Sequence, residues 1–161
     1  MLLAQIPRRR YTNRQTPLEK LEHLTEKLGG PTIYMKRDDL LGLTAGGNKT
    51  RKLEFLMADA IKHGADTVIT TGAIQSNHCR LTLSAAIKEG LHCQLVLQEK
   101  QSGTYDQRAS GNNFLYELLG AENITVVPPE ANPLEEMNRL AMQLRDEGRK
   151  PYVIPLGGSN E

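Results

Sequence analysis

The sequence predicts an α/β fold built on a four-stranded parallel sheet. In the 161-residue chain, four short apolar segments alternate with four longer amphipathic segments. The apolar segments are rich in Val, Ile and Thr, which is typical of strands that are buried on both faces. Parallel strands need crossover connections, and these are usually helices. The alternation therefore favours a parallel sheet with helices on both faces.

Before this alternation, the chain is expected to form one helix and one strand. Thr16 can act as the N-cap of the helix, and Pro17 can occupy its first position. Leucines follow at helical spacing, and Gly29 and Gly30 end the pattern. Residues 32–36 (TIYMK) are rich in strand-forming residues, so a short strand is expected there.

The remaining elements follow a glycine-rich loop at residues 42–48. In chain order, the pattern predicts a helix at 49–63, a strand at 67–71, a helix at 76–89, a strand at 91–97, a helix at 111–119, a strand at 124–127, a helix at 134–147 and a strand at 152–155. The connections between parallel strands are expected to be right-handed.

Composition limits the classes of partner. The formal net charge is +1 at pH 7, which gives no overall basic character of the kind that nucleic-acid-binding proteins show. No run approaches the roughly 20 apolar residues that span a bilayer. The charges near the N-terminus follow a very short apolar stretch, unlike those of a secretory signal. We expect a cytoplasmic protein without nucleic-acid or membrane partners.

Metal binding is not indicated. Cys79 and Cys93 lack the C-x-x-C spacing of zinc sites and are expected to be reduced, partly buried thiols. The four histidines show no H-E-x-x-H or comparable spacing.

The first candidate for chemistry is AGGNKTRK, residues 45–52. Gly46 and Gly47 allow positive φ and close approach of a ligand, and Lys49 follows at the start of a helix. The helix dipole disfavours a positive charge there, which suits a lysine that reacts with an aldehyde in its neutral form. A surface lysine that opens a helix explains the pattern equally well. A phosphate-binding P-loop fits poorly, because Asn48 separates the last glycine from the lysine.

The second candidate is TTGAIQSNH, residues 70–78, between a strand and its following helix. Ligands of open α/β sheets bind at the carboxyl ends of strands, and a helix N-terminus attracts anions, so a substrate carboxylate could bind there. A single glycine does not make the G-x-G-x-x-G dinucleotide motif. By residue type alone, Ser76 and Asn77 are more readily explained as N-caps, and His78 as a structural histidine.

Together the two segments resemble the 1-aminocyclopropane-1-carboxylate deaminase and D-cysteine desulfhydrase family. These are pyridoxal-phosphate (PLP) enzymes of the tryptophan synthase β-subunit fold (fold type II). The resemblance rests on KRDDLLGLTAGGNKTRKLEFL at residues 36–56 and TTGAIQSNHCR at 70–80. It extends to TPLEKLEHLTEKLGG at 16–30 and PYVIPLGGSN at 151–160, and so covers nearly the whole chain.

The resemblance implies a role for each site residue. Lys49 would bind pyridoxal 5'-phosphate covalently and later move the Cα proton of the substrate. Asn48 and Asn77 would contact the cofactor, Asn77 at its 3′-oxygen. Ser76, Asn77 and His78 would bind the substrate, with Ser76 also a catalytic acid–base candidate. The Ser-Asn-His form resembles the desulfhydrase branch, because the cyclopropane deaminases tend to have glutamine at the position of His78.

The implied reaction is an α,β-elimination on a small amino acid, with D-cysteine giving pyruvate, sulfide and ammonia. The cyclopropane acid and L-cysteate are alternative substrates. Family members are much longer and tend to be homodimers. Residues 1–49 would thus be the N-terminal part of a large PLP domain and 50–161 a small α/β domain, with the rest of the large domain absent, including its phosphate-binding loop. An alternative of another class is a truncated, catalytically inactive chain.

Overall fold

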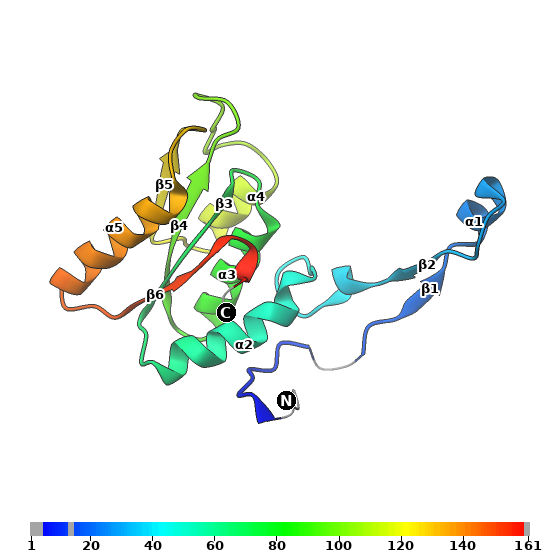
Figure 1. Cartoon of the computed structure of the whole chain (residues 1–161), viewed down its shortest axis with the longest axis horizontal. Helices are drawn as coiled ribbons and strands as arrows, with labels where there is room; N and C mark the ends of the chain where they lie inside the picture. The colour runs from blue at the N-terminus through cyan, green and yellow to red at the C-terminus, as the bar shows by residue number, and fades with distance from the viewer. Residues whose placement is uncertain (1–4, 13–14, 160–161) are drawn as a thin grey trace.

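A four-stranded parallel sheet forms the centre of the molecule (Figure 1). The computed structural model describes residues 5–12 and 15–159. The strand order is β5–β4–β3–β6, and all three neighbouring pairs are parallel. The strands are β3 (Thr67–Ala73), β4 (His92–Gln98), β5 (Asn123–Val127) and β6 (Pro151–Ile154). The predicted α/β fold is confirmed.

Helices cover both faces of this sheet. The four helices that accompany it are α2 (Lys49–Lys62), α3 (Asn77–Lys88), α4 (Asn112–Leu118) and α5 (Pro133–Asp146). Alternate strand residues divide the core in two, as the two-residue period of a strand requires. Val68 and Leu95 pack with residues of α2, α3 and α4, whereas Ile69 and Val96 pack with residues of α5.

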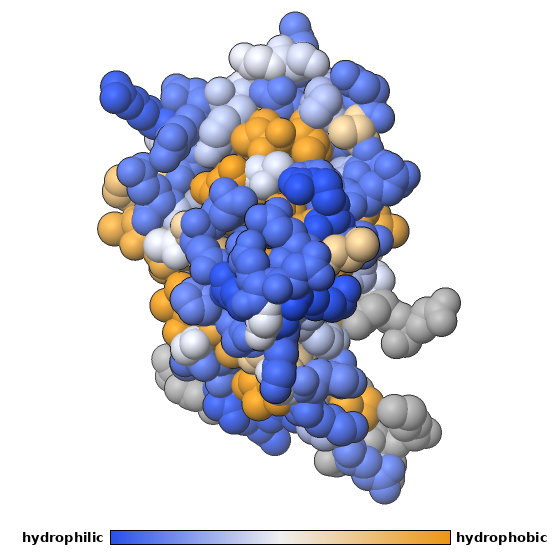
Figure 2. Space-filling model, turned by 90° about the vertical axis from the view of Figure 1, so that its left-hand side faces the viewer, coloured by the Kyte–Doolittle hydropathy of each residue, from blue (hydrophilic) through white to orange (hydrophobic). Residues whose placement is uncertain are grey.

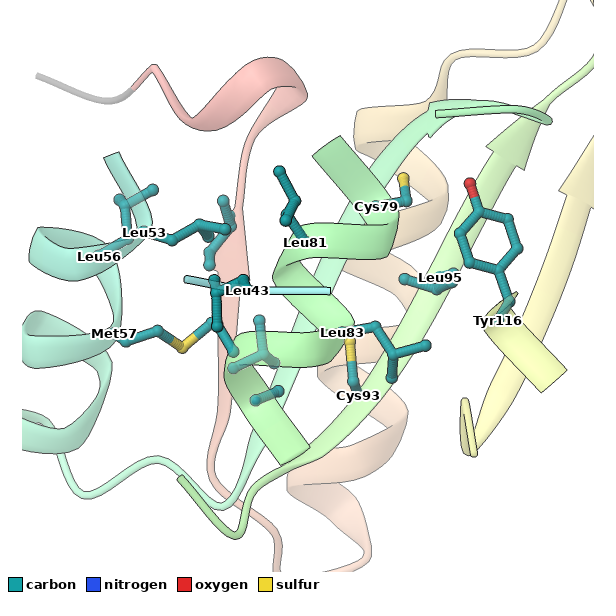
Figure 3. Close-up of a cluster of buried hydrophobic side chains, with 14 of the residues drawn as sticks. Leu43, Leu53, Leu56, Met57, Cys79, Leu81, Leu83, Cys93, Leu95 and Tyr116 are labelled. Atoms are coloured by element: carbon teal, nitrogen blue, oxygen red, sulfur yellow. The ribbon is translucent and has the colours of Figure 1, made fainter. Parts of the chain in front are cut away.

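The larger of the two clusters joins α2 to α3. In Figure 3, Leu53, Leu56 and Met57 of α2 point toward α3. Leu43, from the loop before α2, belongs to the same cluster and is buried. This leucine anchors the glycine-rich loop to the core. Cys79 and Cys93 are free thiols in this cluster, and both are fully buried rather than partly buried as expected.

Helix α5 is amphipathic, as its sequence predicts. Its buried side chains are Met137, Leu140, Ala141 and Leu144, which face the sheet. The side of the molecule on which α5 ends is shown in Figure 2 and is largely hydrophilic, with separate apolar spots. No helix in residues 5–12 and 15–159 has both the length and the apolarity needed to cross a membrane.

A narrow arm projects from the sheet domain (Figure 1). It consists of the antiparallel strands β1 (Leu18–Lys20) and β2 (Tyr34–Lys36), with α1 (Glu22–Leu28) between them. Every residue of both strands is exposed. The 3₁₀ turn η2 (Asp38–Leu40) and the glycine-rich loop connect this arm to α2.

The predicted start of the first helix is wrong. Leu21, not Thr16, is the N-cap of α1, and the residues expected in its first turn form β1. Pairing with β2 gives these residues backbone partners that the local capping signals did not anticipate. The Thr16 hydroxyl instead donates to the Asp38 carboxylate at 3.2 Å. Gly29 ends α1 in the left-handed conformation, as predicted.

The other expected elements are present, and their ends lie within two residues of the predicted positions. The last element in the described residues is the turn η3 (Leu156–Gly158). Asn160, the last residue of the PYVIPLGGSN segment, lies outside the described residues.

Candidate functional site

The structure brings the two candidate segments together. Arg80, in the first turns of α3, donates from Nη2 to the Gly46 carbonyl of the lysine loop at 3.2 Å. The charge of Lys49, at the start of α2, also acts on His78 at the start of α3. Segments that are separate in the sequence therefore form one site beside the carboxyl end of β3.

The loop before Lys49 has an unusual backbone. Ala45, Gly46 and Gly47 all have positive φ, at 53°, 63° and 135°. A Cβ on Gly46 would lie 1.7 Å from the Asp39 carbonyl oxygen, so no larger residue fits there without movement of the backbone. The predicted conformational role of these glycines is confirmed. Lys49 itself is half-buried at the first position of α2, and Asn48 before it is exposed and makes no side-chain capping bond.

Ser76 is the N-cap of α3. Its Oγ accepts the Cys79 backbone N–H at 3.2 Å. Gly72 makes room for this cap, since a Cβ there would lie 2.4 Å from the Ser76 Oγ. The capping alternative holds for Ser76 but not for Asn77, which is the first residue of the helix. The cap uses only a lone pair of the Ser76 oxygen, so the hydroxyl proton of Ser76 remains free to be donated to a ligand.

Asn77 is exposed, and its side-chain oxygen is engaged. The Oδ1 atom accepts from Asn112 Nδ2 at 3.0 Å and from Arg80 Nη2 at 3.4 Å. Asn112 also donates from Nδ2 to the Gln75 carbonyl at 2.8 Å. The start of α4 therefore holds the start of α3 in place.

His78 is buried and neutral. The Thr70 hydroxyl donates to the Ile154 carbonyl at 3.0 Å, so the 3.0 Å contact between Thr70 Oγ1 and His78 Nε2 requires Nε2 to be the donor. The other ring nitrogen, Nδ1, then carries no proton. Burial, together with the nearby positive charges of Lys49 and Lys52, lowers the pKa of His78 to about 4. His78 thus has the structural role that its residue type suggested, at the border of the lysine site.

Three residues of this region were not identified from the sequence. Lys52 donates from Nζ to the Gly157 carbonyl at 3.1 Å and to the Ser159 hydroxyl at 2.8 Å, which ties η3 to α2. Arg80 lies within the TTGAIQSNHCR segment but had no assigned role, and Asn112 belongs to a distant part of the chain. Neither hydrophobic periodicity nor a short motif links Arg80 to Asn112.

The residues fit PLP as a ligand. Lys49 supplies an amine for an aldehyde, and the amide of Asn77 and the hydroxyl of Ser76 supply polar contacts. Two buried nitrogens, Arg80 Nη1 and His78 Nδ1, have no hydrogen-bond partner among the described residues. The positive charge of Arg80 suits a phosphorylated, anionic ligand, whereas His78 Nδ1 carries no proton and can only accept a hydrogen bond. Within the described ranges, no three His, Cys, Asp or Glu residues are placed to hold a metal ion.

A pocket of about 520 Å³ opens nearby, at the carboxyl ends of β3 and β4. Thr71, Gly72 and Ala73 of β3 contribute to its wall, together with Met137 of α5 and Leu156 of η3. Its position follows the general rule for ligand sites of open α/β sheets.

Comparison with known proteins shows the family to which this chain belongs. Residues 10–161 match the family described as "Pyridoxal-phosphate dependent enzyme". The D-cysteine desulfhydrase of Yersinia enterocolitica is 47% identical over 160 residues, which cover 98% of this chain and 48% of that protein. That of Klebsiella pneumoniae is 45% identical over 159 residues, with the same two shares.

A solved structure is also similar. It is described as "Crystal Structure Analysis of the ACC deaminase homologue" and superposes with a TM-score of 0.85 at 41% identity, covering 98% of this chain and 47% of that chain. This chain therefore spans about half the length of the curated relatives that it matches. The resemblance noted in the sequence is confirmed at the level of the family and the fold. The chain belongs to the family of pyridoxal-phosphate dependent enzymes.

Proposed function

We propose that this chain supplies the lysine segment and the substrate-binding segment of a PLP-dependent lyase. The proposed reaction is an α,β-elimination on a small amino acid, with D-cysteine giving pyruvate, sulfide and ammonia. The observation that carries this proposal is the contact between Arg80 and the Gly46 carbonyl, which joins the loop of Lys49 to the start of α3. The names of the relatives favour D-cysteine over the cyclopropane acid and L-cysteate.

Lys49 has two tasks in this proposal. Its amine would bind the aldehyde of the cofactor and, once displaced, would take the proton from Cα of the substrate. When bound, PLP supplies an electron sink for the negative charge that forms at Cα. Asn48, next to Lys49, and Asn77 would contact the cofactor, with Asn77 donating to its 3′-oxygen.

The start of α3 would receive the substrate. A helix N-terminus stabilises an anion, so residues 76–78 are proposed to bind the substrate carboxylate. Ser76 keeps its hydroxyl proton while it caps the helix, which allows it to donate to the carboxylate or act as an acid–base group. His78 adds no positive charge there at neutral pH, because burial keeps it unprotonated.

The proposed domain division places residues 1–49 in a large PLP domain and 50–161 in a small domain. Two findings support it: the chain spans about half of its relatives, and the arm presents large apolar side chains to solvent. These are Leu18, Leu24, Leu28, Tyr34 and Met35, and Leu40 of the adjoining η2 is also exposed. We further propose that the full-length protein is a cytoplasmic homodimer with no nucleic-acid or membrane partner.

The test begins with the lysine. The purified 161-residue chain is mixed with PLP, its visible absorption spectrum is recorded, and the adduct is reduced with borohydride and located by peptide mass spectrometry. The expected adduct is on Lys49 and is lost in Lys49→Ala but kept in Lys52→Ala. An adduct that forms equally well in Lys49→Ala would overturn the proposal.

The substrate is then tested by product. D-cysteine and L-cysteate should both release pyruvate, accompanied by sulfide and sulfite respectively, and the cyclopropane acid should release 2-oxobutanoate. The proposal expects D-cysteine to react fastest. An adduct on Lys49 without turnover of any of the three would favour the alternative of a catalytically inactive chain.

A further inference from the structure

Arg80 is a buried cation without a carboxylate partner. Its exposed fraction is 4%, and it forms no ion pair with any residue that the structure describes. Six other arginines do pair with carboxylates: Arg8, Arg9, Arg37, Arg51, Arg139 and Arg149. Burial lowers the pKa of Arg80, which reflects the cost of removing its charge from water. Burying an unpaired charge is costly and calls for an explanation.

The guanidinium of Arg80 connects three segments of the site. Its Nε donates to Asn112 Oδ1 at 2.8 Å, at the start of α4. Its Nη2 donates to the Gly46 carbonyl at 3.2 Å and to Asn77 Oδ1 at 3.4 Å. The remaining nitrogen, Nη1, is buried without a partner among the described residues. One side chain thus contacts the lysine loop, the first residue of α3 and the first residue of α4.

These contacts fix the orientation of the Asn77 amide. Both neighbours of its side chain, Arg80 Nη2 and Asn112 Nδ2, are donors, so the atom that they contact must be the oxygen. Turning the amide over would place its NH₂ group against two donors. The NH₂ group of Asn77 is therefore the end that remains for a ligand. It can donate to an anionic oxygen but cannot accept from a protonated one.

We propose that Arg80 is a positioning residue for PLP. It holds the Asn77 amide with its NH₂ group toward the cofactor and holds the Gly46 carbonyl so that the loop places Lys49. Its unbalanced positive charge favours an anionic ligand at the same site. This inference rests on the proposed function, because it takes PLP to be the ligand of Lys49.

The experiment separates positioning from covalent binding by using two ligands. PLP reacts with Lys49, whereas 4′-deoxypyridoxine phosphate lacks the aldehyde and binds without a covalent bond. Dissociation constants for both are measured on the purified chain, together with the absorption spectrum of the PLP adduct and the thermal unfolding temperature. The variants are Arg80→Gln, Arg80→Lys and Asn112→Ser. The control is Arg149→Gln, since Arg149 also has one buried nitrogen without a partner but pairs with Glu122.

Loss of a charge-assisted hydrogen bond predicts that Arg80→Gln weakens the binding of both ligands about tenfold or more. The absorption maximum of its PLP adduct should shift, because the contact of Asn77 with the 3′-oxygen is lost. Arg80→Lys should recover part of the affinity, and Arg149→Gln should bind both ligands like the unmodified chain. The inference would be overturned if Arg80→Gln unfolds at the same temperature as the unmodified chain, binds both ligands with unchanged affinity and gives an unchanged absorption spectrum of the PLP adduct.

If Arg80→Gln does not fold, the inference is tested with Asn112→Ser instead. Asn112 is only partly buried. Its substitution removes one donor to Asn77, the donor to the Gln75 carbonyl and the acceptor of Arg80 Nε, while leaving the contact of Arg80 with Gly46. It should weaken the binding of both ligands about threefold or more, because the Asn77 amide loses a donor and Arg80 loses an acceptor that hold them in place. Unchanged affinities in this variant would also overturn the inference. Neither result bears on whether Lys49 forms the adduct, which the Lys49→Ala comparison decides separately.

Discussion

The carboxylate of Glu54 holds the backbone of Tyr11 against α2. Its Oε1 accepts the N–H of Tyr11 at 2.9 Å, and the same atom accepts the N–H of Thr12 at 2.9 Å. Arg8 forms an ion pair with the other carboxylate oxygen. Glu54 is fully buried, so these three groups replace the water that its charge would otherwise bind. The N-terminal segment is thereby fastened to the sheet domain.

Substitution of Glu54 should destabilise the fold. Burial alone would raise the pKa of Glu54, but the two backbone donors and Arg8 outweigh it and lower the pKa below its usual range. Glu54→Gln keeps one oxygen for the two backbone N–H groups but replaces the oxygen that pairs with Arg8 by an NH₂ donor. The buried ion pair is lost, so we expect the free energy of unfolding to fall by about 2–3 kcal/mol. Urea unfolding at pH 7 measures the change. The exposed Glu130→Gln is the control, and an equal effect of both substitutions would contradict the assigned role of Glu54.

The stability of the chain should fall in mild acid because of His78. Its pKa is lowered from 6.5 to about 4 in the folded chain, so below about pH 6.5 the unfolded chain binds a proton that the folded chain does not. This contribution destabilises the fold progressively as the pH falls from about 6.5 to about 4, by up to about 3 kcal/mol. In His78→Asn this part of the pH dependence should be absent. Unfolding measured at intervals between pH 7 and pH 4 should show the difference, and parallel curves for the two proteins would refute it.

Gly46 should tolerate substitution far less well than Gly103. Both have positive φ, but a Cβ on Gly103 meets nothing within 4 Å, whereas on Gly46 it would lie 1.7 Å from the Asp39 carbonyl oxygen. Gly103→Ala should therefore cost only the strain of the left-handed conformation, about 1–2 kcal/mol. Gly46→Ala should cost clearly more and should also reduce formation of the PLP adduct, because the loop of Lys49 must move. Thermal unfolding and the adduct spectrum of the two variants test this, and equal losses would argue against a constrained loop.

Lys52 should control local rather than global stability. It ties η3 to α2 through two hydrogen bonds that are exposed to solvent. Exposed contacts of this kind contribute little, so Lys52→Ala should change the free energy of unfolding by less than about 1 kcal/mol. The amides of residues 157–159 should nevertheless exchange with solvent faster than in the unmodified chain. Hydrogen exchange read by mass spectrometry can resolve this, and unchanged protection at η3 would show that the two bonds do not hold the turn.

The sheet and its helices could be predicted because their signals are local. Each strand is a short run of β-branched and apolar residues, and each helix has a buried stripe that its spacing reveals, such as Met137, Leu140 and Leu144 in α5. Strand β1 could not be predicted in this way. Leu18 forms a strand because it pairs with Lys36, and the sequence of residues 18–20 alone does not predict this pairing.

The site was predictable to the same extent. The positive φ at Gly46 and Gly47 follows from the residue type, and Ser76 as an N-cap follows from its place before a helix. The contact of Arg80 with Asn112 joins positions 32 residues apart and depends on how α4 packs against α3. Such a contact becomes visible only when the tertiary structure is known.

The arm has a consequence for how the chain behaves in solution. In the described residues β1 and β2 form a two-stranded sheet, and each strand has one edge that is not paired with another strand. An exposed edge that carries Leu18, Tyr34 and Met35 is a template for pairing with another chain. A two-stranded sheet is also only marginally stable by itself. At high concentration, copies of this 161-residue chain should therefore associate through their arms by adding strand to strand, while their sheet domains remain separately folded.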